Sequence, residues 1–135
     1  MREILFRAKR EDNGEWAYGY YVCLPDVAGS VSMLHVPAGN PDESNKTYYV
    51  KKSTVGQFTG LTDKNGTKIF EGDIIQTYDP DDGYAVVRYD ETETEFYADF
   101  IGENVYYGLG GNFRIDDIEI IGNIYDNPEL IGGEK

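Results

Sequence analysis

Hydrophobic and polar residues alternate with a period of two along most of the chain, the pattern of half-buried β-strands. No amphipathic helical stripe of about 12 or more residues interrupts it. Near the N-terminus, two alternating segments, residues 4–9 and 15–22, flank the turn sequence Asp12-Asn13-Gly14. They predict a β-hairpin whose second strand presents an aromatic face. That face consists of Trp16, Tyr18, Tyr20 and Val22.

The middle of the chain mixes loop and strand signals. Residues 25–45 are rich in Pro, Gly, Ser, Asp and Asn, and they predict a long excursion with one embedded strand at 31–36. Strand character resumes at 47–51. Residues 53–62 fit either a short helical turn capped by Ser53 or a bent strand, and the sequence leaves both open. Asp63-Lys64-Asn65-Gly66 predicts a second tight turn.

The second half continues the β pattern. Segments 69–78 and 84–89 predict a second hairpin, and the next strand places Phe96, Ala98 and Phe100 on its core side. Carboxylates alternate with these residues on the water side of that strand: Glu91, Glu93, Glu95 and Asp99. A Gly-rich turn at 108–111 precedes short strands around 113–115 and 118–124.

This arrangement predicts a mainly β fold with few or short helices. We expect an N-terminal hairpin followed by a strongly bent C-terminal sheet or an SH3-like barrel. The 135 residues fit a single domain, 1–135, and the pattern is compatible with sub-lobes 1–66 and 67–135.

Charge narrows the classes of partner. The net charge is −13, which disfavours direct binding to nucleic acid or to an anionic membrane. Residues 1–70 hold nine basic and eight acidic side chains, whereas residues 71–135 hold three and seventeen. These acidic residues are interleaved with apolar residues, so we expect them to lie on the surface of folded structure and not in an acidic tail.

Cysteine content and the N-terminus bear on location. Cys23 is the only cysteine, which excludes an intramolecular disulfide and a Cys-ligated zinc site within one chain. The N-terminal segment has no secretory apolar region, and no window approaches the ~18 apolar residues of a membrane helix. We therefore expect a cytoplasmic protein.

Several segments of the chain resemble those of a known family. Residues 54–66 read TVGQFTGLTDKNG and residues 68–75 read KIFEGDII, which is similar to the signature of the YopX family. Residues 121–130, IGNIYDNPEL, resemble the C-terminal signature of that family, and the opening hairpin also fits. The resemblance implies a β-rich phage or prophage protein in a bacterial host cell, and it carries no activity over to individual residues.

No motif specifies a reaction. Gly108 and Gly110 lack the third glycine of a dinucleotide loop, and Asp79, Asp81 and Asp82 lack the glycine and the bidentate glutamate of a calcium loop. His35 has no second histidine or nucleophile motif beside it. We therefore expect neither a cofactor nor a metal.

Glu71 and Asp73 are the catalytic candidates, because apolar neighbours could raise the pKa of either carboxyl. A structural explanation competes with catalysis: Gly72 would permit a sharp turn, and Asp73 would bind backbone N–H groups there.

Three functions follow in order of preference. The first is a binding module that contacts a protein partner, or a second copy of itself, through Trp16, Tyr18 and Tyr20 and through the acidic C-terminal face. The second is a nucleic-acid mimic, because carboxylates at alternate strand positions lie about 6.7 Å apart, near twice the charge spacing of a DNA strand. The third is an enzyme that uses Glu71 and Asp73.

Overall fold

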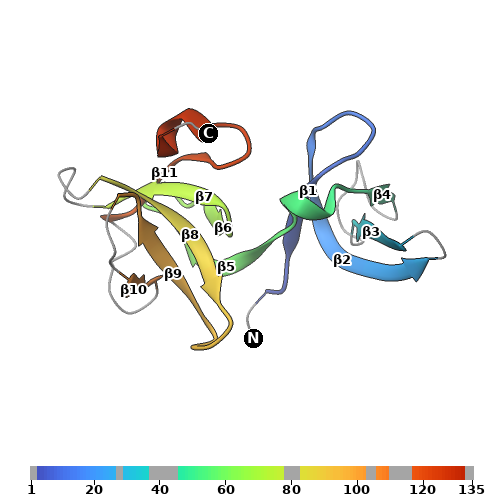
Figure 1. The fold of residues 1–135 in the computed structure, drawn as a ribbon, viewed down its shortest axis with the longest axis horizontal. Coiled ribbons are helices and arrows are strands. Elements are labelled where there is room, and N and C mark those ends of the chain that lie inside the picture. Colours follow the sequence, from blue (N-terminus) through green and yellow to red (C-terminus); the bar gives the residue numbers. More distant parts are fainter. Residues whose placement is uncertain are drawn as a thin grey trace. The chain divides into compact units, whose positions relative to one another are not determined.

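The protein is built from antiparallel β-strands (Figure 1), as the sequence predicts. This computed structural model describes residues 3–26, 29–36, 46–77, 83–102, 106–109 and 117–132. The chain divides into two compact units, Met1–Phe58 and Thr59–Lys135. Its named helical elements in these ranges are short 3-10 turns, η1 (Lys52–Thr54) and η4 (Pro128–Ile131).

The predicted N-terminal hairpin is confirmed. β1 (Phe6–Lys9) pairs antiparallel with β2 (Trp16–Asp26), in a register that runs from Phe6 opposite Gly19 to Lys9 opposite Trp16. The turn closes through hydrogen bonds from the Arg10 amide to the Glu15 carbonyl (2.9 Å) and from the Gly14 amide to the Arg10 carbonyl (3.0 Å).

Three further strands extend this hairpin into a sheet, and the last of them, β5, runs from the first unit into the second. β3 (Gly29–His35) pairs with β2 and confirms the strand embedded in the 25–45 excursion. β4 (Thr47–Tyr49) pairs with β3, and β5 (Gly56–Thr62) pairs with β1, giving the order β4-β3-β2-β1-β5. The remaining parts of the excursion, 27–28 and 37–45, lie outside the described residues.

The chain after β4 joins the two sides of this sheet. The Val50 amide donates to the Ser32 carbonyl (3.0 Å), and the Lys51 amide donates to the Lys9 carbonyl (2.9 Å). The sheet therefore curls around a core of small and aliphatic side chains with aromatic residues at its margin. The fully buried members are Ala8, Ala17, Leu34 and Val50, and the partly buried ones are Phe6, Tyr21, Tyr48 and Val55.

Residues 53–62 contain both structures that the sequence left open, since η1 leads directly into β5. Ser53 is not the cap, because η1 begins after Lys51 and has no side-chain cap hydrogen bond. Thr54 fixes the turn instead. Its hydroxyl donates to the Lys51 carbonyl (2.7 Å) and accepts from the Lys9 amide (2.9 Å).

The second unit contains a sheet of five antiparallel strands in the order β10-β9-β8-β7-β11. Its members are β7 (Asp73–Gln76), β8 (Tyr84–Asp90), β9 (Glu95–Phe100), β10 (Tyr106–Gly108) and β11 (Glu119–Asn123). β6 (Lys68–Phe70) precedes them and neighbours β5. The second predicted hairpin is present as β7 and β8, with Ile74 opposite Val86. The described strands form an open, bent sheet and not a closed barrel.

One face of this sheet forms the larger core. Alternate residues of β8 and β9 supply it, as the sequence predicts for Ala98 and Phe100. The buried members are Ile69, Ile75, Ala85, Val87, Ala98, Phe100, Leu109 and Ile118. The opposite face also buries Ile74 and Val86, and Ile131 of η4 lines a hollow of about 460 Å³ beside Val86. Both faces of the central strands are therefore partly covered.

Several sequence-based expectations fall on residues that are not described. They concern Asp79, Asp81, Asp82, Gly110 and the strand expected at 113–115.

Candidate functional site

An exposed row of large side chains runs along β2. Alternate residues of a strand share a face, and cross-strand partners in an antiparallel pair share it too. Trp16, Tyr18, Tyr20, Val22 and Leu24 therefore lie together, as predicted for the first four. Their register partners are Arg7 and Lys9 of β1, Val31, Met33 and His35 of β3, and, one strand further, Thr47 and Tyr49 of β4. These residues define the aromatic face.

The aromatic face is exposed over most of its length. Tyr18 is 46% exposed, Tyr20 50%, and Tyr49 63%. Val22 and Leu24 are also exposed. The opposite face of the same strands supplies the core residues Ala17 and Leu34. Because one face fills the core, period-two alternation leaves the other face to solvent.

Positive charge gathers at one end of the aromatic face. The Arg7 guanidinium carbon lies 4.6 Å from the centroid of the Trp16 ring, and Lys9 Nζ lies 5.4 Å from it. Both distances fit cation–π contacts. Trp16 is half-buried beneath these cations and so differs from the open rings of Tyr18 and Tyr20. None of the residues that define the face is Asp or Glu.

A polar hollow adjoins β4. It measures about 400 Å³ and is lined by Glu11, Asp12, Thr47, Tyr48 and Tyr49. Arg10 Nη2 lies 2.7 Å from Asp12 Oδ2 and Arg10 Nε lies 3.0 Å from Asp12 Oδ1. This hydrogen bonding lowers the pKa of Asp12 and raises that of Arg10. The Arg10 guanidinium carbon also lies 4.1 Å from the Tyr48 ring centroid. The Asp12 carboxylate at this hollow is therefore already engaged with Arg10.

The catalytic candidates Glu71 and Asp73 lie at the turn between β6 and β7. Asp73 is 2% exposed, and its Oδ2 accepts a hydrogen bond from the Phe70 amide at 2.8 Å. Gly72 has φ of +90°, a conformation that favours glycine. The turn geometry expected from the sequence is therefore present. Asp73 has a structural partner, and Glu71 is half-buried beside it.

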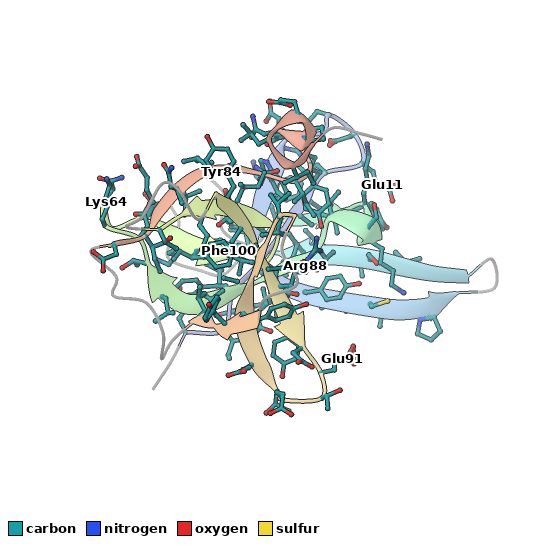
Figure 2. All side chains as sticks on the ribbon, turned by 60° about the vertical axis from the view of Figure 1, so that its left-hand side comes forward. Glu11, Lys64, Tyr84, Arg88, Glu91 and Phe100 are labelled. Atoms are coloured by element: carbon teal, nitrogen blue, oxygen red, sulfur yellow. The ribbon has the colours of Figure 1, made fainter. Side chains whose placement is uncertain are left out.

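The acidic candidates are divided between two elements. Glu95 and Asp99 lie on one face of β9, whereas Glu91 and Glu93 lie in the turn 91–94 that joins β8 to β9. Figure 2 shows Glu91 at this turn. Asp90 closes this turn, because its Oδ1 accepts the amides of Thr92 (2.8 Å) and Glu93 (3.3 Å). The single row of four carboxylates expected along one strand is therefore wrong.

A cation also interrupts the acidic face. Arg88 lies across from β9, and its Nε donates to Asp99 Oδ2 at 2.8 Å. Glu95 packs over Gly108, where an added Cβ would lie 2.9 Å from Glu95 Oε2. The two acids that share β9 thus have different surroundings.

The described ranges hold neither a metal-binding cluster nor a membrane-spanning helix. No group of three or more His, Cys, Asp or Glu side chains there is placed to hold a metal ion. No helix among those residues is long and apolar enough to cross a membrane.

The sequence model for the family described as YopX protein matches residues 5–132. The chain belongs to the YopX family. Among solved structures, protein EF1440 from Enterococcus faecalis has a TM-score of 0.56 and 24% identity, over 97% of this chain and 99% of that one. Protein yopX from Bacillus subtilis has a TM-score of 0.51 and 17% identity, over 100% of both chains. No curated protein sequence matches. At these identities the structural likeness shows a shared YopX fold.

Two of the segments that suggested the YopX family, 68–75 and 121–130, meet in the second unit. The Ile124 amide donates to the Gly72 carbonyl at 2.9 Å, and an added Cβ at Gly72 would lie 3.1 Å from the Tyr125 ring. Asn127 Oδ1 accepts the Asn123 amide at 3.2 Å. These contacts are a backbone hydrogen bond, a side-chain bond to a backbone amide and the packing of a ring. These residues of the family signatures therefore help to hold the fold together.

Sequence reasoning missed part of the aromatic face. Leu24 continues the alternation of Tyr18, Tyr20 and Val22, so extending the same pattern would have found it. Tyr49 joins the face only through the pairing of β4 with β3, where it lies opposite Met33. The local sequence carries no signal for that register.

Proposed function

We propose that this YopX protein is a phage- or prophage-derived accessory protein that binds a protein partner through its aromatic face in the bacterial cytoplasm. The observation that carries the proposal is the exposure of Tyr18, Tyr20, Val22, Leu24 and Tyr49 on one face of one sheet. Scattered exposed apolar side chains are ordinary, whereas a contiguous group of them is typical of an interaction surface.

The chemistry of the face supports a protein partner. Tyrosine is enriched in protein interfaces because its ring buries apolar area while its hydroxyl binds polar groups at the rim. The absence of carboxylates among the residues that define the face lowers the cost of desolvating it.

The charge distribution favours the first unit as the contact. Residues 1–58 hold seven basic and seven acidic side chains, so the whole net charge of −13 comes from residues 59–135. A partner that docks on the first unit therefore meets a region of zero net charge.

The test is a capture experiment from bacterial lysate at low and high salt, read by mass spectrometry. The tagged wild-type chain is compared with Tyr18→Glu, which charges the face, and with Tyr89→Glu. Tyr89 is 40% exposed in the second unit and lies outside the aromatic face. We expect capture that survives high salt, is lost with Tyr18→Glu and persists with Tyr89→Glu. Capture that is unchanged by Tyr18→Glu would contradict the proposal.

The nucleic-acid mimic ranks below this proposal. Glu95 and Asp99 share one face of β9 in the acidic unit, which favours mimicry. The ion pair of Arg88 with Asp99 and the displacement of Glu91 and Glu93 into a turn count against it. Salt-sensitive capture of DNA-binding proteins that does not depend on Tyr18 would favour mimicry.

An enzyme acting through Glu71 and Asp73 ranks third. The hydrogen bond from the Phe70 amide to Asp73 Oδ2 fits a side chain that holds the turn.

A further inference from the structure

We propose that the occupant of the aromatic face is a second copy of this chain, related by a twofold axis that runs across β2 at Tyr20. This inference rests on the proposed function, because it assigns a partner to the same face. It also predicts a specific contact, Tyr20 against Tyr20 of the second copy.

The order of side chains along β2 is self-complementary about Tyr20. The aromatic residues Trp16 and Tyr18 precede it, and the aliphatic residues Val22 and Leu24 follow it. A twofold axis across the strand reverses the direction of the second β2, so Tyr18 of one copy meets Val22 of the other. The rings of Trp16 and Tyr18 are then each placed against a smaller side chain on either side of the Tyr20 pair, which favours interdigitated packing between two sheet faces about 10 Å apart.

The cations are compatible with this arrangement. Arg7 and Lys9 lie opposite Tyr18 and Trp16, on one side of Tyr20 along the strand direction. The twofold axis places the corresponding pair of the second copy on the other side of Tyr20, so the two sets of cations stay apart. Both cations of each copy remain over Trp16 of that copy.

Net charge makes this face the most suitable part of the chain for self-contact. Two copies that meet through Met1–Phe58 bring together units of zero net charge. Contact between the two acidic second units would instead bring together two net charges of −13, which repel each other. Added salt should therefore leave the dimer unchanged or strengthen it by screening the repulsion between the acidic second units.

Sedimentation velocity of the full chain tests the inference at about 10 and about 200 µM, in low and high salt. The monomer mass is 15.2 kDa, and we expect about twice that mass at the higher concentration. Tyr20→Glu and Tyr20→Lys each place two like charges at the axis, and we expect either variant to weaken dimerisation at least about tenfold. Tyr89→Glu adds the same charge as Tyr20→Glu in the second unit and should behave as wild type. Circular dichroism of each variant checks that it is folded.

The decisive sample is an equimolar mixture of Tyr20→Glu and Tyr20→Lys. Opposite charges then face each other at the axis, so the mixture should regain the dimer while neither variant forms it alone. A monomeric wild-type chain under all four conditions would overturn the second copy as occupant. So would a dimer that Tyr20→Glu leaves intact, or a mixture that stays monomeric.

These outcomes separate the inference from the proposed function. A monomeric chain whose lysate capture is lost with Tyr20→Glu leaves the protein-binding function standing with another partner. If the chain is monomeric and neither Tyr18→Glu nor Tyr20→Glu changes the lysate capture, both the inference and the proposed function are contradicted.

Discussion

The carboxylate of Asp63 binds the backbone of Ile120 across 57 residues of sequence, with 3.0 Å between Oδ2 and the amide nitrogen. Its Oδ1 accepts two more amides, from Asn65 (2.9 Å) and Thr67 (3.0 Å). Asp63 is 3% exposed, so these bonds lie largely out of water. One buried side chain thus shapes the turn between β5 and β6 and fastens it to β11.

Replacing Asp63 by asparagine should destabilise the protein. The variant Asp63→Asn keeps one oxygen for the turn amides and places an NH2 group opposite the Ile120 N–H, where no acceptor remains. An unsatisfied buried donor costs ~1–3 kcal/mol, so we expect a loss of that size in the free energy of unfolding, measured in urea. Asp12→Asn is the control, because Asp12 is exposed, and its loss of stability should be clearly smaller than that of Asp63→Asn. Equal losses of unfolding free energy in the two variants would show that the buried hydrogen bonds of Asp63 stabilise the fold no more than an exposed carboxylate does.

Acid should remove the contribution of Asp63 to the free energy of unfolding. Burial raises the pKa of Asp63, but the hydrogen bonds from Ile120, Thr67 and Asn65 outweigh burial, and the pKa lies below its ordinary value. A carboxyl whose folded pKa is depressed stabilises the folded state above its unfolded pKa of about 3.9 and loses that effect as pH falls through the folded pKa. The stability difference between wild type and Asp63→Asn should be constant above about pH 5 and shrink below about pH 4. A difference that does not change with pH in that acid range would contradict this assignment.

Gly72 should tolerate a side chain less well than Gly60. The two have nearly the same φ, +90° and +91°, so the backbone strain from an added Cβ is matched. Only Gly72 is crowded, with the Tyr125 ring 3.1 Å from the added Cβ, whereas Gly60 has nothing within 4 Å. We expect Gly60→Ala to cost about 1 kcal/mol and Gly72→Ala ~1–3 kcal/mol, with Gly72→Val at least as costly. Matching denaturation midpoints for Gly72→Ala and Gly60→Ala would show that Tyr125 moves aside freely.

The sequence predicts the elements whose causes are local. Alternation along β2 places Tyr18 and Tyr20 on one face because successive side chains of a strand point to opposite sides. Asp12-Asn13-Gly14 predicts a turn because glycine accepts positive φ, and Gly14 has φ of +74°. Each of these predictions needs only neighbours within a few residues.

Features set by long-range pairing were not predictable from one sequence. Tyr49 reaches the aromatic face through its register with Met33, and Arg88 reaches Asp99 across the β8–β9 hairpin. The prediction of a single acidic row failed for a different, local reason. The Asp90 carboxylate captures the amides of the following residues and ends the strand, and period-two alternation does not reveal this competition.

Gly19→Ala should destabilise the first unit although it adds strand propensity. An added Cβ at Gly19 would overlap the carbonyl oxygen of His35 and lie 2.9 Å from its carbonyl carbon. Those atoms belong to the backbone of β3, so relief requires β2 and β3 to separate. We expect a loss of ~1–3 kcal/mol in thermal or urea unfolding, where a glycine in open strand geometry would gain stability from the same change. A higher midpoint for Gly19→Ala would show that β2 and β3 do not approach as closely as the structure has them.

Duplex DNA should not bind this protein at physiological salt. Non-specific affinity for DNA depends on protein cations that neutralise phosphates. The second unit instead carries a net charge of −13, which repels the phosphates. Three cations of the first unit already have partners, since Arg7 and Lys9 lie over Trp16 and Arg10 binds Asp12. A phosphate would have to draw them away while the acidic unit repels the rest of the duplex. We therefore expect no gel shift with a dissociation constant below the ~10⁻⁶ M limit of ordinary non-specific binding. Tighter binding that weakens with added salt would require a basic surface that the charge distribution does not provide. Such a result would favour nucleic acid over protein as the partner.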